Sequence, residues 1–170
     1  MDKIERIDTV FDANKEKLKF DNYCYEPFID YNNYYTKFNN LENSKYNINT
    51  KSNGKHLICD SNINNRMILE KILNNKNCNC DFAFDGYDVI EKIKINGKYD
   101  VIWMDLLLSK MNGIDCTKYL RKVLKYNGTI NCLTCCCDII TKNDCFKSGM
   151  NNIIQKPINV DVLYNLIEKK

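Results

Sequence analysis

Val101-Ile102-Trp103-Met104-Asp105 joins an uninterrupted apolar run to a single acidic residue, and this stretch decides the fold. Four apolar residues in a row, without the polar alternation of a half-exposed strand, predict a strand that is buried on both faces. Strands of that kind belong to parallel sheets covered by helices. An acid directly after such a strand lies at the carboxyl edge of the sheet, where functional groups of open α/β sheets collect.

Short apolar runs of the same type recur along the chain, separated by amphipathic segments. We expect five strands at 56–59, 81–84, 101–104, 129–133 and 152–155. Apolar residues at helical spacing predict five helices over 64–75, 87–95, 114–124, 138–147 and 160–169. Regular alternation of strand and helix favours a parallel sheet, and right-handed crossovers place helices on both of its faces. The expected fold class is therefore α/β, a doubly wound five-stranded parallel sheet.

The first part of the chain differs in composition from the rest. Residues 1–54 hold ten of the 26 Asn and six of the 11 Tyr, while all five expected strands lie in residues 55–170. Helically spaced apolar residues between Ile4 and Leu18 predict a short amphipathic helix, followed by irregular sequence. We interpret 1–54 as a largely irregular N-terminal extension, either poorly ordered or a docking segment whose aromatic residues pack on the domain or a partner.

Composition excludes several classes of protein. Hydrophobic residues make up 44% of the 170 residues, which is enough for a real core. A net charge of +3 is too small to indicate nucleic-acid binding. No stretch approaches the roughly 18 uncharged apolar residues of a membrane span, and Met1–Arg6 lacks the apolar core of a signal peptide. We expect a soluble cytoplasmic protein that binds neither nucleic acid nor membrane.

The ten cysteines raise the alternative of a metal centre. Cys132 and Cys135 form a C-x-x-C pair, and Cys78 and Cys80 lie upstream. A zinc site needs two separated pairs, or a pair with histidines, whereas the only histidine is His56. Since Cys132 also lies inside an expected strand, the interpretation as reduced thiols that behave as small apolar residues is favoured.

Polar residues end four of the expected strands. Asp60, Asp105, Thr134 and Lys156 each follow or close a different apolar run. Because the carboxyl ends of parallel strands meet at one edge of the sheet, we expect these four side chains to lie close together. Each alone has a structural explanation as a turn or capping residue, but their shared position indicates a functional site.

Five short motifs in order resemble one known family. Residues 104–113 resemble the pattern M-D-x-x-M-P-x-M-D-G, 133–135 resemble L-T-A, 149–152 resemble A-G-M-D-D, 155–157 resemble S-K-P, and 85–86 fall where D-G stands. This set resembles the response-regulator receiver domain of two-component and phosphorelay signalling, and is similar to the receivers of hybrid histidine kinases. The resemblance covers residues 55–170 and implies a flavodoxin-like receiver fold.

The resemblance implies a phospho-acceptor site. Asp105 is implied to attack a phosphorus carried on a histidine and to become 4-aspartylphosphate. Two anions must then approach each other, so a cation and a lysine are needed to neutralise their repulsion. Lys156 and Thr134 are implied to contact phosphate oxygens, with Cys135 as the small residue beside them. The implied cation is Mg²⁺, which favours oxygen ligands. Its implied ligands are Asp60, Asp105, the backbone carbonyl of Leu107 and, weakly or through water, Ser61.

The sequence also departs from the family pattern. Ser61 stands where a second acid usually ligates the metal, so one negative charge is lost and weaker Mg²⁺ binding is expected. Ile153 replaces the aromatic residue that swings inward in the family, which predicts an absent or altered switch. Ser109 replaces the usual proline, and Asn112 the usual aspartate.

Three functional hypotheses follow. The first is a stand-alone receiver, not an enzyme, that accepts a phosphoryl group from a histidine kinase or a histidine phosphotransfer protein. It would signal by protein contact through the fourth helix, fifth strand and fifth helix. The second is a degenerate pseudo-receiver that binds partners without phosphorylation, which Ser61 and Ile153 favour. The third, an unrelated small hydrolase, lacks the G-x-S-x-G motif and a phosphate-cradling glycine loop. The cognate kinase, the output partner and the oligomeric state are left open.

Overall fold

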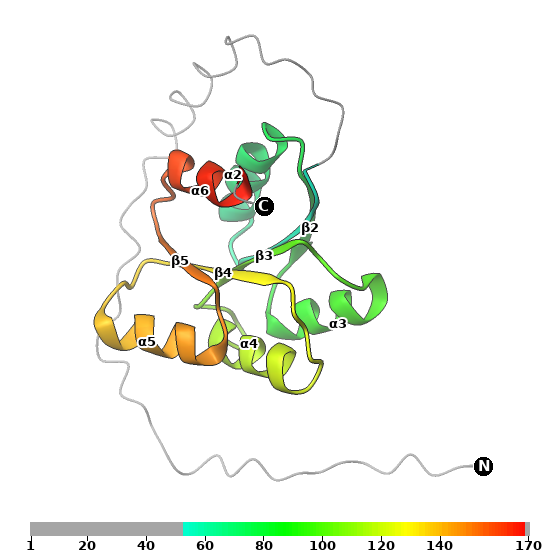
Figure 1. Ribbon diagram of the computed structural model, residues 1–170, viewed down its shortest axis with the longest axis vertical. Helices are drawn as coiled ribbons and strands as arrows, with labels where there is room; N and C mark the ends of the chain where they lie inside the picture. The colour runs from blue at the N-terminus through cyan, green and yellow to red at the C-terminus, as the bar shows by residue number, and fades with distance from the viewer. Residues whose placement is uncertain (1–52, 169–170) are drawn as a thin grey trace, which may run out of the picture.

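A computed structural model describes residues 53–168, which form a five-stranded sheet with five helices (Figure 1). The strands are β1 (Lys55–Cys59), β2 (Asn79–Ala83), β3 (Val101–Asp105), β4 (Thr129–Thr134) and β5 (Asn152–Gln155). The helices are α2 (Ile63–Asn74), α3 (Gly86–Asn96), α4 (Gly113–Lys122), α5 (Ile139–Ser148) and α6 (Val160–Glu168). The predicted fold class, a doubly wound five-stranded parallel sheet, is confirmed.

The strand order explains where a site can form. The sheet runs β2-β1-β3-β4-β5 and every neighbouring pair is parallel. After β1 the chain turns to one edge of the sheet, and after β2 it crosses back to β3 on the other side of β1. The carboxyl ends of β1 and β3 therefore lie on either side of the point where the winding direction reverses, which is where open α/β sheets bind their ligands.

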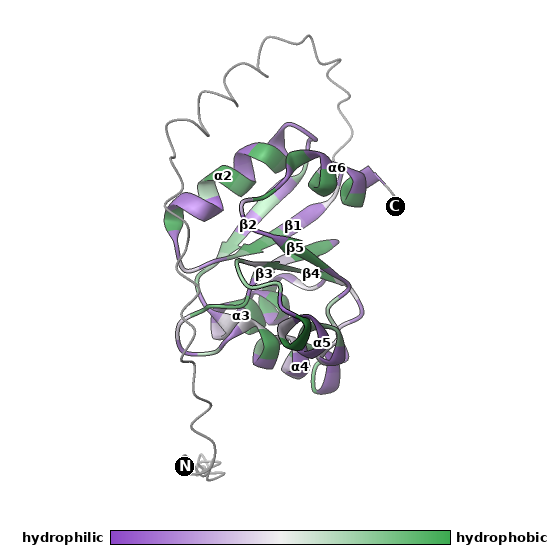
Figure 2. Cartoon of the chain, turned by 90° about the vertical axis from the view of Figure 1, so that its left-hand side faces the viewer, coloured by the Kyte–Doolittle hydropathy of each residue, from purple (hydrophilic) through white to green (hydrophobic). Residues whose placement is uncertain are grey.

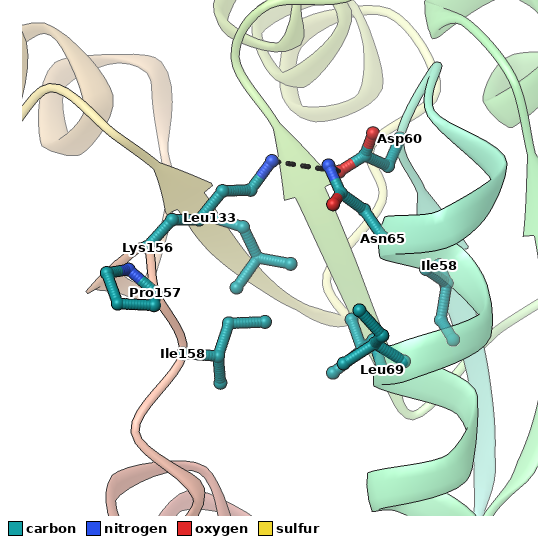
Figure 3. A pocket seen from close by; sticks show the side chains of 9 residues that line it. Ile58, Asp60, Asn65, Leu69, Leu133, Lys156, Pro157 and Ile158 are labelled. Carbon is teal, nitrogen blue, oxygen red and sulfur yellow. Dashed lines mark hydrogen bonds and ion pairs between the residues drawn. The ribbon is translucent and has the colours of Figure 1, made fainter. Parts of the chain in front are cut away.

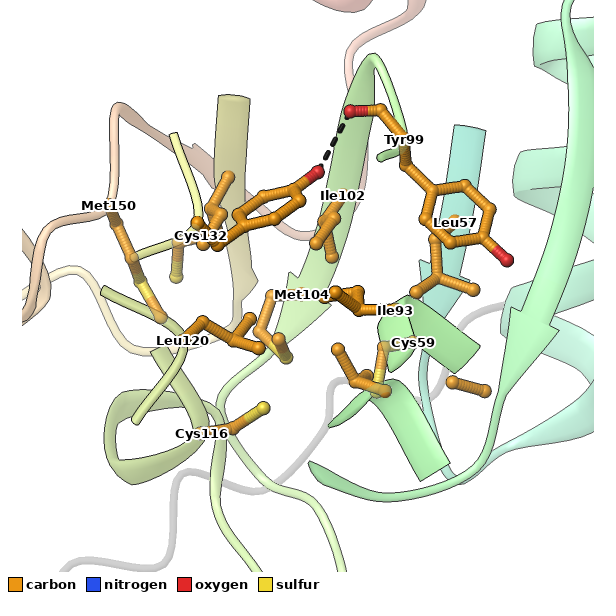
Figure 4. Packing of buried hydrophobic residues seen from close by; sticks show 14 of the residues in the cluster. Leu57, Cys59, Ile93, Tyr99, Ile102, Met104, Cys116, Leu120, Cys132 and Met150 are labelled. Atoms are coloured by element: carbon orange, nitrogen blue, oxygen red, sulfur yellow. Dashed lines mark hydrogen bonds between the residues drawn. The ribbon is translucent and has the colours of Figure 1, made fainter. Parts of the chain in front are cut away.

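Helices cover both faces of the sheet. Figures 1 and 2 show α2 and α6 on one face and α3, α4 and α5 on the other. The two faces carry separate cores because side chains alternate along a buried strand. Ile102 and Met104 pack toward α3 and α4 with Leu120 and Cys132 (Figure 4), whereas Trp103 packs toward α2 and α6.

A buried polar pair lies within the second of these cores. His56 and Trp103 are both fully buried, and Trp103 Nε1 donates a hydrogen bond of 3.0 Å to His56 Nδ1. An unpaired indole N–H or imidazole nitrogen would be costly at this depth, so the pairing explains how a histidine is tolerated in β1. Trp103 lies two residues before Asp105, on the strand that supplies the predicted acceptor.

Polar caps start four of the helices and set the loops at the edge of the sheet. Asn62, Asp85, Asn112 and Asp138 each accept backbone N–H hydrogen bonds from the first turn of the following helix. Asn112 Oδ1 accepts from Asp115 N at 2.8 Å. Asparagine and aspartate are comparable N-caps, so Asn112 caps α4 as well as an aspartate at this position would.

The predicted bounds of the second strand were wrong. We expected residues 81–84, but β2 runs from Asn79 to Ala83. Its bounds follow from pairing with β1, in which Lys55 faces Asn79 and Cys59 faces Ala83. Phe84 lies beyond the strand, and its 54% exposed ring stacks under the Arg66 guanidinium at 4.5 Å. The expected helix and irregular extension of residues 1–52 lie outside the described residues.

Two further observations concern the expectations from composition. Within residues 53–168 no helix combines the length and the apolar character that crossing a membrane requires. Cys132 is fully buried in β4, with its Sγ 3.8 Å from the Sγ of Cys145 in α5. Burial raises the pKa of the Cys145 thiol, so both groups pack as neutral apolar side chains.

Candidate functional site

Three of the predicted site residues meet at the carboxyl edge of the sheet. Lys156 Nζ donates to Asp60 Oδ2 at 2.8 Å and to Asp105 Oδ2 at 2.9 Å. Figure 3 shows the Lys156 ammonium reaching across from the end of β5 toward Asp60, which follows β1. All three side chains are buried, and the Lys156–Pro157 peptide bond is cis. One ammonium therefore bridges two carboxylates that belong to different strands.

The Asp60 carboxylate is held by several donors. Asn62 N donates to Oδ1 at 2.8 Å, and Asn65 Nδ2 donates to Oδ2 at 3.1 Å. Arg66 supports the same turn, since its Nη1 donates to the backbone oxygen of Asp60 at 2.6 Å. The sequence analysis did not single out Asn65 or Arg66. Their spacing of five and six residues after Asp60, in the first turn of the helix that follows the acid, is the signal that could have indicated them.

Asp105 ends the fully buried strand β3. Its Oδ1 accepts a hydrogen bond of 3.3 Å from Leu107 N, and its side chain is only 8% exposed. The loop after it returns closely: Gly113 N donates to Leu106 O at 3.1 Å. A Cβ atom on Gly113 would collide with the backbone oxygen of Asp105. Gly113 is therefore required for the close approach that places the start of α4 under the acceptor.

The electrostatics of the pair are set by burial and proximity. Burial raises the pKa of Asp105, and the negative charge of Asp60 raises it further. The positive charge of Lys156 lowers the same pKa, but by less than burial and Asp60 together raise it, so the pKa of Asp105 lies above its ordinary value. Burial alone would lower the pKa of Lys156, but Asp105 and Asp60 outweigh it and the pKa is raised. Lys156 is thus a permanent cation between two carboxylates.

Thr134 is the last residue of β4 and lies buried at the same edge. Its hydroxyl is engaged with its own loop: Oγ1 accepts from Cys136 N at 3.0 Å and donates to Cys136 O at 3.3 Å. The structure therefore places Thr134 at the site with its hydroxyl bonded to the β4–α5 loop. Ile153, in β5, is partly buried and packs against the core on the α3–α5 face.

Two residues of the predicted metal set, Ser61 and Leu107, lie in the loops that follow β1 and β3. Ser61 is exposed at the turn before α2, and no hydrogen bond of its side chain is present within the described part of the chain. The Leu107 side chain is 60% exposed, whereas its backbone N donates to Asp105 Oδ1 at 3.3 Å. The backbone of Leu107 therefore lies beside Asp105.

The oxygen-rich chemistry of this edge fits a hard divalent cation, with few side-chain ligands. Residues 53–168 contain no cluster of three His, Cys, Asp or Glu side chains able to hold a metal. The available donors are the two carboxylates of Asp60 and Asp105, together with backbone and amide oxygens. Mg²⁺ is commonly held by one or two carboxylates with several waters, so this set fits that ion.

An ion pair fixes the loop that follows Asp105. Lys110, which has a positive φ of 60°, places its Nζ 2.9 Å from Asp85 Oδ2 at the start of α3. The hydrogen bond from Lys110 lowers the pKa of Asp85. Gly86 N also donates to Met111 O at 3.3 Å. The loop of residues 106–112 is thus fastened to the β2–α3 turn, a contact that the sequence analysis missed.

Beside the ion pair lies a small hollow of about 30 Å³ on the α2 and α6 face (Figure 3). Polar groups line one end of it, namely Asp60, Asn65 and Lys156, and apolar side chains line the rest. The hollow lies between α2 and the segment after β5, and Asp60 is the carboxylate that lines it.

A comparison with protein families matches residues 56–168 to the response regulator receiver domain. The chain belongs to the receiver domain family of two-component and phosphorelay systems. The match covers the described strands from His56 onward, together with the four polar residues at their ends.

Relatives support the same family. The osmosensing histidine protein kinase SLN1 of Saccharomyces cerevisiae is 30% identical over 78% of this chain, which spans 11% of that kinase. Two-component response regulator 24 of Arabidopsis thaliana is 28% identical over 66% of this chain and 81% of its own length. The receiver domain of the Francisella response regulator 1452 superposes with a TM-score of 0.64 at 26% identity, over 68% of this chain and 94% of that chain. The chain therefore spans a small part of its kinase relatives.

Proposed function

We propose that this receiver accepts a phosphoryl group on Asp105 from a phosphohistidine donor. The observation that carries the proposal is the buried Asp105 carboxylate, held by a lysine that also contacts a second acid. Such a carboxylate can act as a nucleophile only if the negative charge of the incoming phosphoryl group is neutralised. Lys156 is a cation at hydrogen-bond distance from the attacking group, so it can serve this purpose.

The reaction forms one bond and breaks one. A carboxylate oxygen of Asp105 bonds to phosphorus while the P–N bond of the donor breaks, and the imidazole leaves with that electron pair. Lys156 would move its contact from the carboxylate to a phosphoryl oxygen. Thr134 would exchange its hydrogen bond with Cys136 O for one to another phosphoryl oxygen. A bound Mg²⁺ would neutralise further charge, with Asp60, Asp105 and the Leu107 carbonyl as its ligands.

A donor protein that packs on apolar side chains beside the site is the partner that the exposed surface supports. Exposed apolar side chains surround the site: Ile63 and Met67 on α2 are 60% and 52% exposed, and Leu107 beside Asp105 is 60% exposed. A related receiver, that of Ssk1, has been crystallised with the histidine phosphotransfer protein Ypd1, and it is 26% identical with a TM-score of 0.63. We propose a histidine kinase or a histidine phosphotransfer protein as the donor here.

The proposal also covers the cellular location of the domain and the surface through which it signals. The domain is proposed to act in the cytoplasm as a phospho-acceptor that is not itself an enzyme for other substrates. Ile139 and Ile140 at the start of α5 are 78% and 74% exposed, which supports output by contact with a protein through the α5–β5–α6 surface.

The test is the intact mass of the full chain after incubation with Mg²⁺ and a phosphorylated histidine phosphotransfer protein. We expect the addition of one phosphoryl group, absent in Asp105→Asn. The matched control is Asp115→Asn, which removes an exposed acid of α4 and should leave the addition unchanged. Phosphate on the Asp105→Asn variant would exclude Asp105 as the acceptor.

The alternative is a pseudo-receiver that binds partners without phosphorylation. One observation favours it: Lys156 already pairs with both carboxylates while Ser61 adds no third acid. In that case no phosphoryl group would appear with any donor, and partner binding would be equal for wild type and Asp105→Asn.

A further inference from the structure

The side chain of Asn65 lies in contact with the Asp60 carboxylate, which the sequence analysis did not predict. We infer that the Asn65 side-chain oxygen serves as a ligand of the divalent cation and stands in for the carboxylate missing at Ser61. The inference rests on the proposed function, since the cation concerned is the one that assists phosphoryl transfer to Asp105. It names a ligand that the family pattern does not contain.

The position of Asn65 carries the inference. Its amide lies in the first turn of α2, half-buried, and reaches Asp60 Oδ2 at 3.1 Å. That same oxygen accepts from Lys156 Nζ at 2.8 Å. Asn65 therefore touches the atom at which the acid, the lysine and the hollow meet, as Figure 3 shows. Ser61, in contrast, is exposed at the outside of the turn.

The chemistry of an amide suits two states of the site. An asparagine amide has a donor nitrogen and an acceptor oxygen of similar size, and rotation about its terminal bond exchanges them. In the structure the nitrogen faces Asp60, and the Asn65 oxygen accepts no hydrogen bond from any residue between 53 and 168. Turned by half a rotation, that oxygen joins Asp60 as a hard neutral ligand of the kind Mg²⁺ and Ca²⁺ accept.

This arrangement also explains how the site tolerates the loss of an acid. A carboxylate at position 65 would repel Asp60 whenever no cation is bound, since the two groups would be in contact. The amide donates to Asp60 in the cation-free form and can donate electron density to a cation in the bound form. Asn65 can therefore act in both states without adding charge.

A purely structural role for Asn65 makes a different prediction. If Asn65 only orients Asp60, its removal weakens cation binding equally whatever residue stands at position 61. If it replaces the missing ligand, its removal no longer matters once Ser61→Asp supplies that ligand. A double-mutant cycle separates the two, because it measures the dependence of one substitution on the other.

The experiment measures Mn²⁺ affinity of the full chain from the free-ion electron paramagnetic resonance signal, with Mg²⁺ as competitor. We expect Asn65→Ala to weaken binding about tenfold, and the matched control Asn64→Ala, an exposed neighbour on the same turn, to leave it unchanged. In the Ser61→Asp background, Asn65→Ala should change the affinity less than about twofold. Asn65→Asp keeps the size and offers only oxygens, so it should tighten binding.

Several results would overturn the inference. These are an equal loss from Asn65→Ala in both backgrounds, a loss no larger than that of Asn64→Ala, weaker binding by Asn65→Asp, and no Mn²⁺ binding by the wild type. Circular dichroism melts show whether Asn65→Ala is folded, and Asn65→Asp provides the test if it is not. Failure of the proposed function appears separately, as absence of phosphoryl transfer in the mass experiment while the cation affinities follow the expected pattern.

Discussion

Lys156 Nζ lies 2.9 Å from Asp105 Oδ2, although the two residues are 51 positions apart in the chain. The contact occupies the carboxylate that we propose to be the nucleophile, and the same ammonium holds Asp60. The proposed reaction must therefore replace an internal ion pair with a contact to the phosphoryl group. This exchange leads to predictions about stability as well as about phosphorylation.

Replacing Asp105 with Asn should stabilise the domain at neutral pH. Burial raises the native pKa of Asp105 above its unfolded value of about 3.9. The native state therefore binds this proton more tightly than the unfolded state does, and ionised Asp105 contributes unfavourably to folding. Asp105→Asn should consequently melt at a higher temperature than wild type at pH 7, as measured by calorimetry.

The sign of the pH dependence provides a check on this prediction. The advantage of Asp105→Asn should shrink as the pH falls through the raised native pKa toward about 3.9, and vanish below it. An advantage that is the same at pH 7 and at low pH would show that the charge of Asp105 is not its cause.

Replacing Lys156 with Met should be strongly destabilising. The substitution leaves Asp60 and Asp105 buried without their common cation, and removal of one partner of a buried ion pair costs about 3–5 kcal/mol. Chemical denaturation should report this loss, and Lys156→Arg, which keeps the charge, should lose less. Adding Asp105→Asn to Lys156→Met should recover part of the stability, because one unpaired carboxylate is then removed.

Replacing Ser61 with Asp should strengthen Mg²⁺ binding and speed phosphorylation of Asp105. The new carboxylate beside Asp60 adds a hard anionic ligand. Without Mg²⁺ the variant should be slightly less stable than wild type, by less than about 1 kcal/mol, since position 61 is exposed. The measurement is the rise in melting temperature with added Mg²⁺, compared with the neutral control Ser61→Asn. Equal rises would show that the missing acid does not limit this site.

Replacing Gly113 with Ala should disrupt the edge of the sheet at Asp105. The added Cβ would collide with the backbone oxygen of Asp105, so the loop or strand must shift, at a cost of about 1–3 kcal/mol. Ser109→Ala, at an exposed position of the same loop, is the control and should change the free energy of unfolding by less than about 0.5 kcal/mol. Unaltered stability of Gly113→Ala would contradict the close packing of this turn.

Removing residues 1–50 should leave the domain folded, because every strand of the described sheet begins at or after Lys55. The melting temperature of a chain of residues 51–170, followed by circular dichroism, should lie within about 4 °C of that of the full chain. A larger loss, corresponding to about 1 kcal/mol in a domain of this size, would mean that the segment packs on the receiver.

The sheet could be predicted from the sequence because its inner strands are continuous apolar runs, as in 101–104. Short continuous apolar runs are typical of strands that are buried on both faces of a parallel sheet. The edge strand β2 was predicted less well. Its residues Asn79 and Asp81 are polar, and its bounds depend on hydrogen bonding to β1 rather than on its own hydrophobicity.

The functional site, like the sheet, was predictable only in part. The positions of Asp60, Asp105, Thr134 and Lys156 were predictable, since strand ends converge at one edge. The partners of these residues were not. The contact of Asn65 with Asp60 and that of Lys110 with Asp85 depend on side-chain rotamers and loop conformation, which the order of residues does not determine.

The position of Lys156 at the end of the last strand has a consequence for biosynthesis. Asp60 and Lys156 are separated by 96 positions, and the lysine follows β5, the last strand of the described sheet to leave the ribosome. A nascent chain, or one that is cleaved before β5, holds Asp60 and Asp105 without their ammonium. The proposed phosphoryl transfer therefore requires that β5 has been synthesised and has joined the sheet, so chains that lack β5 should not accept phosphoryl groups.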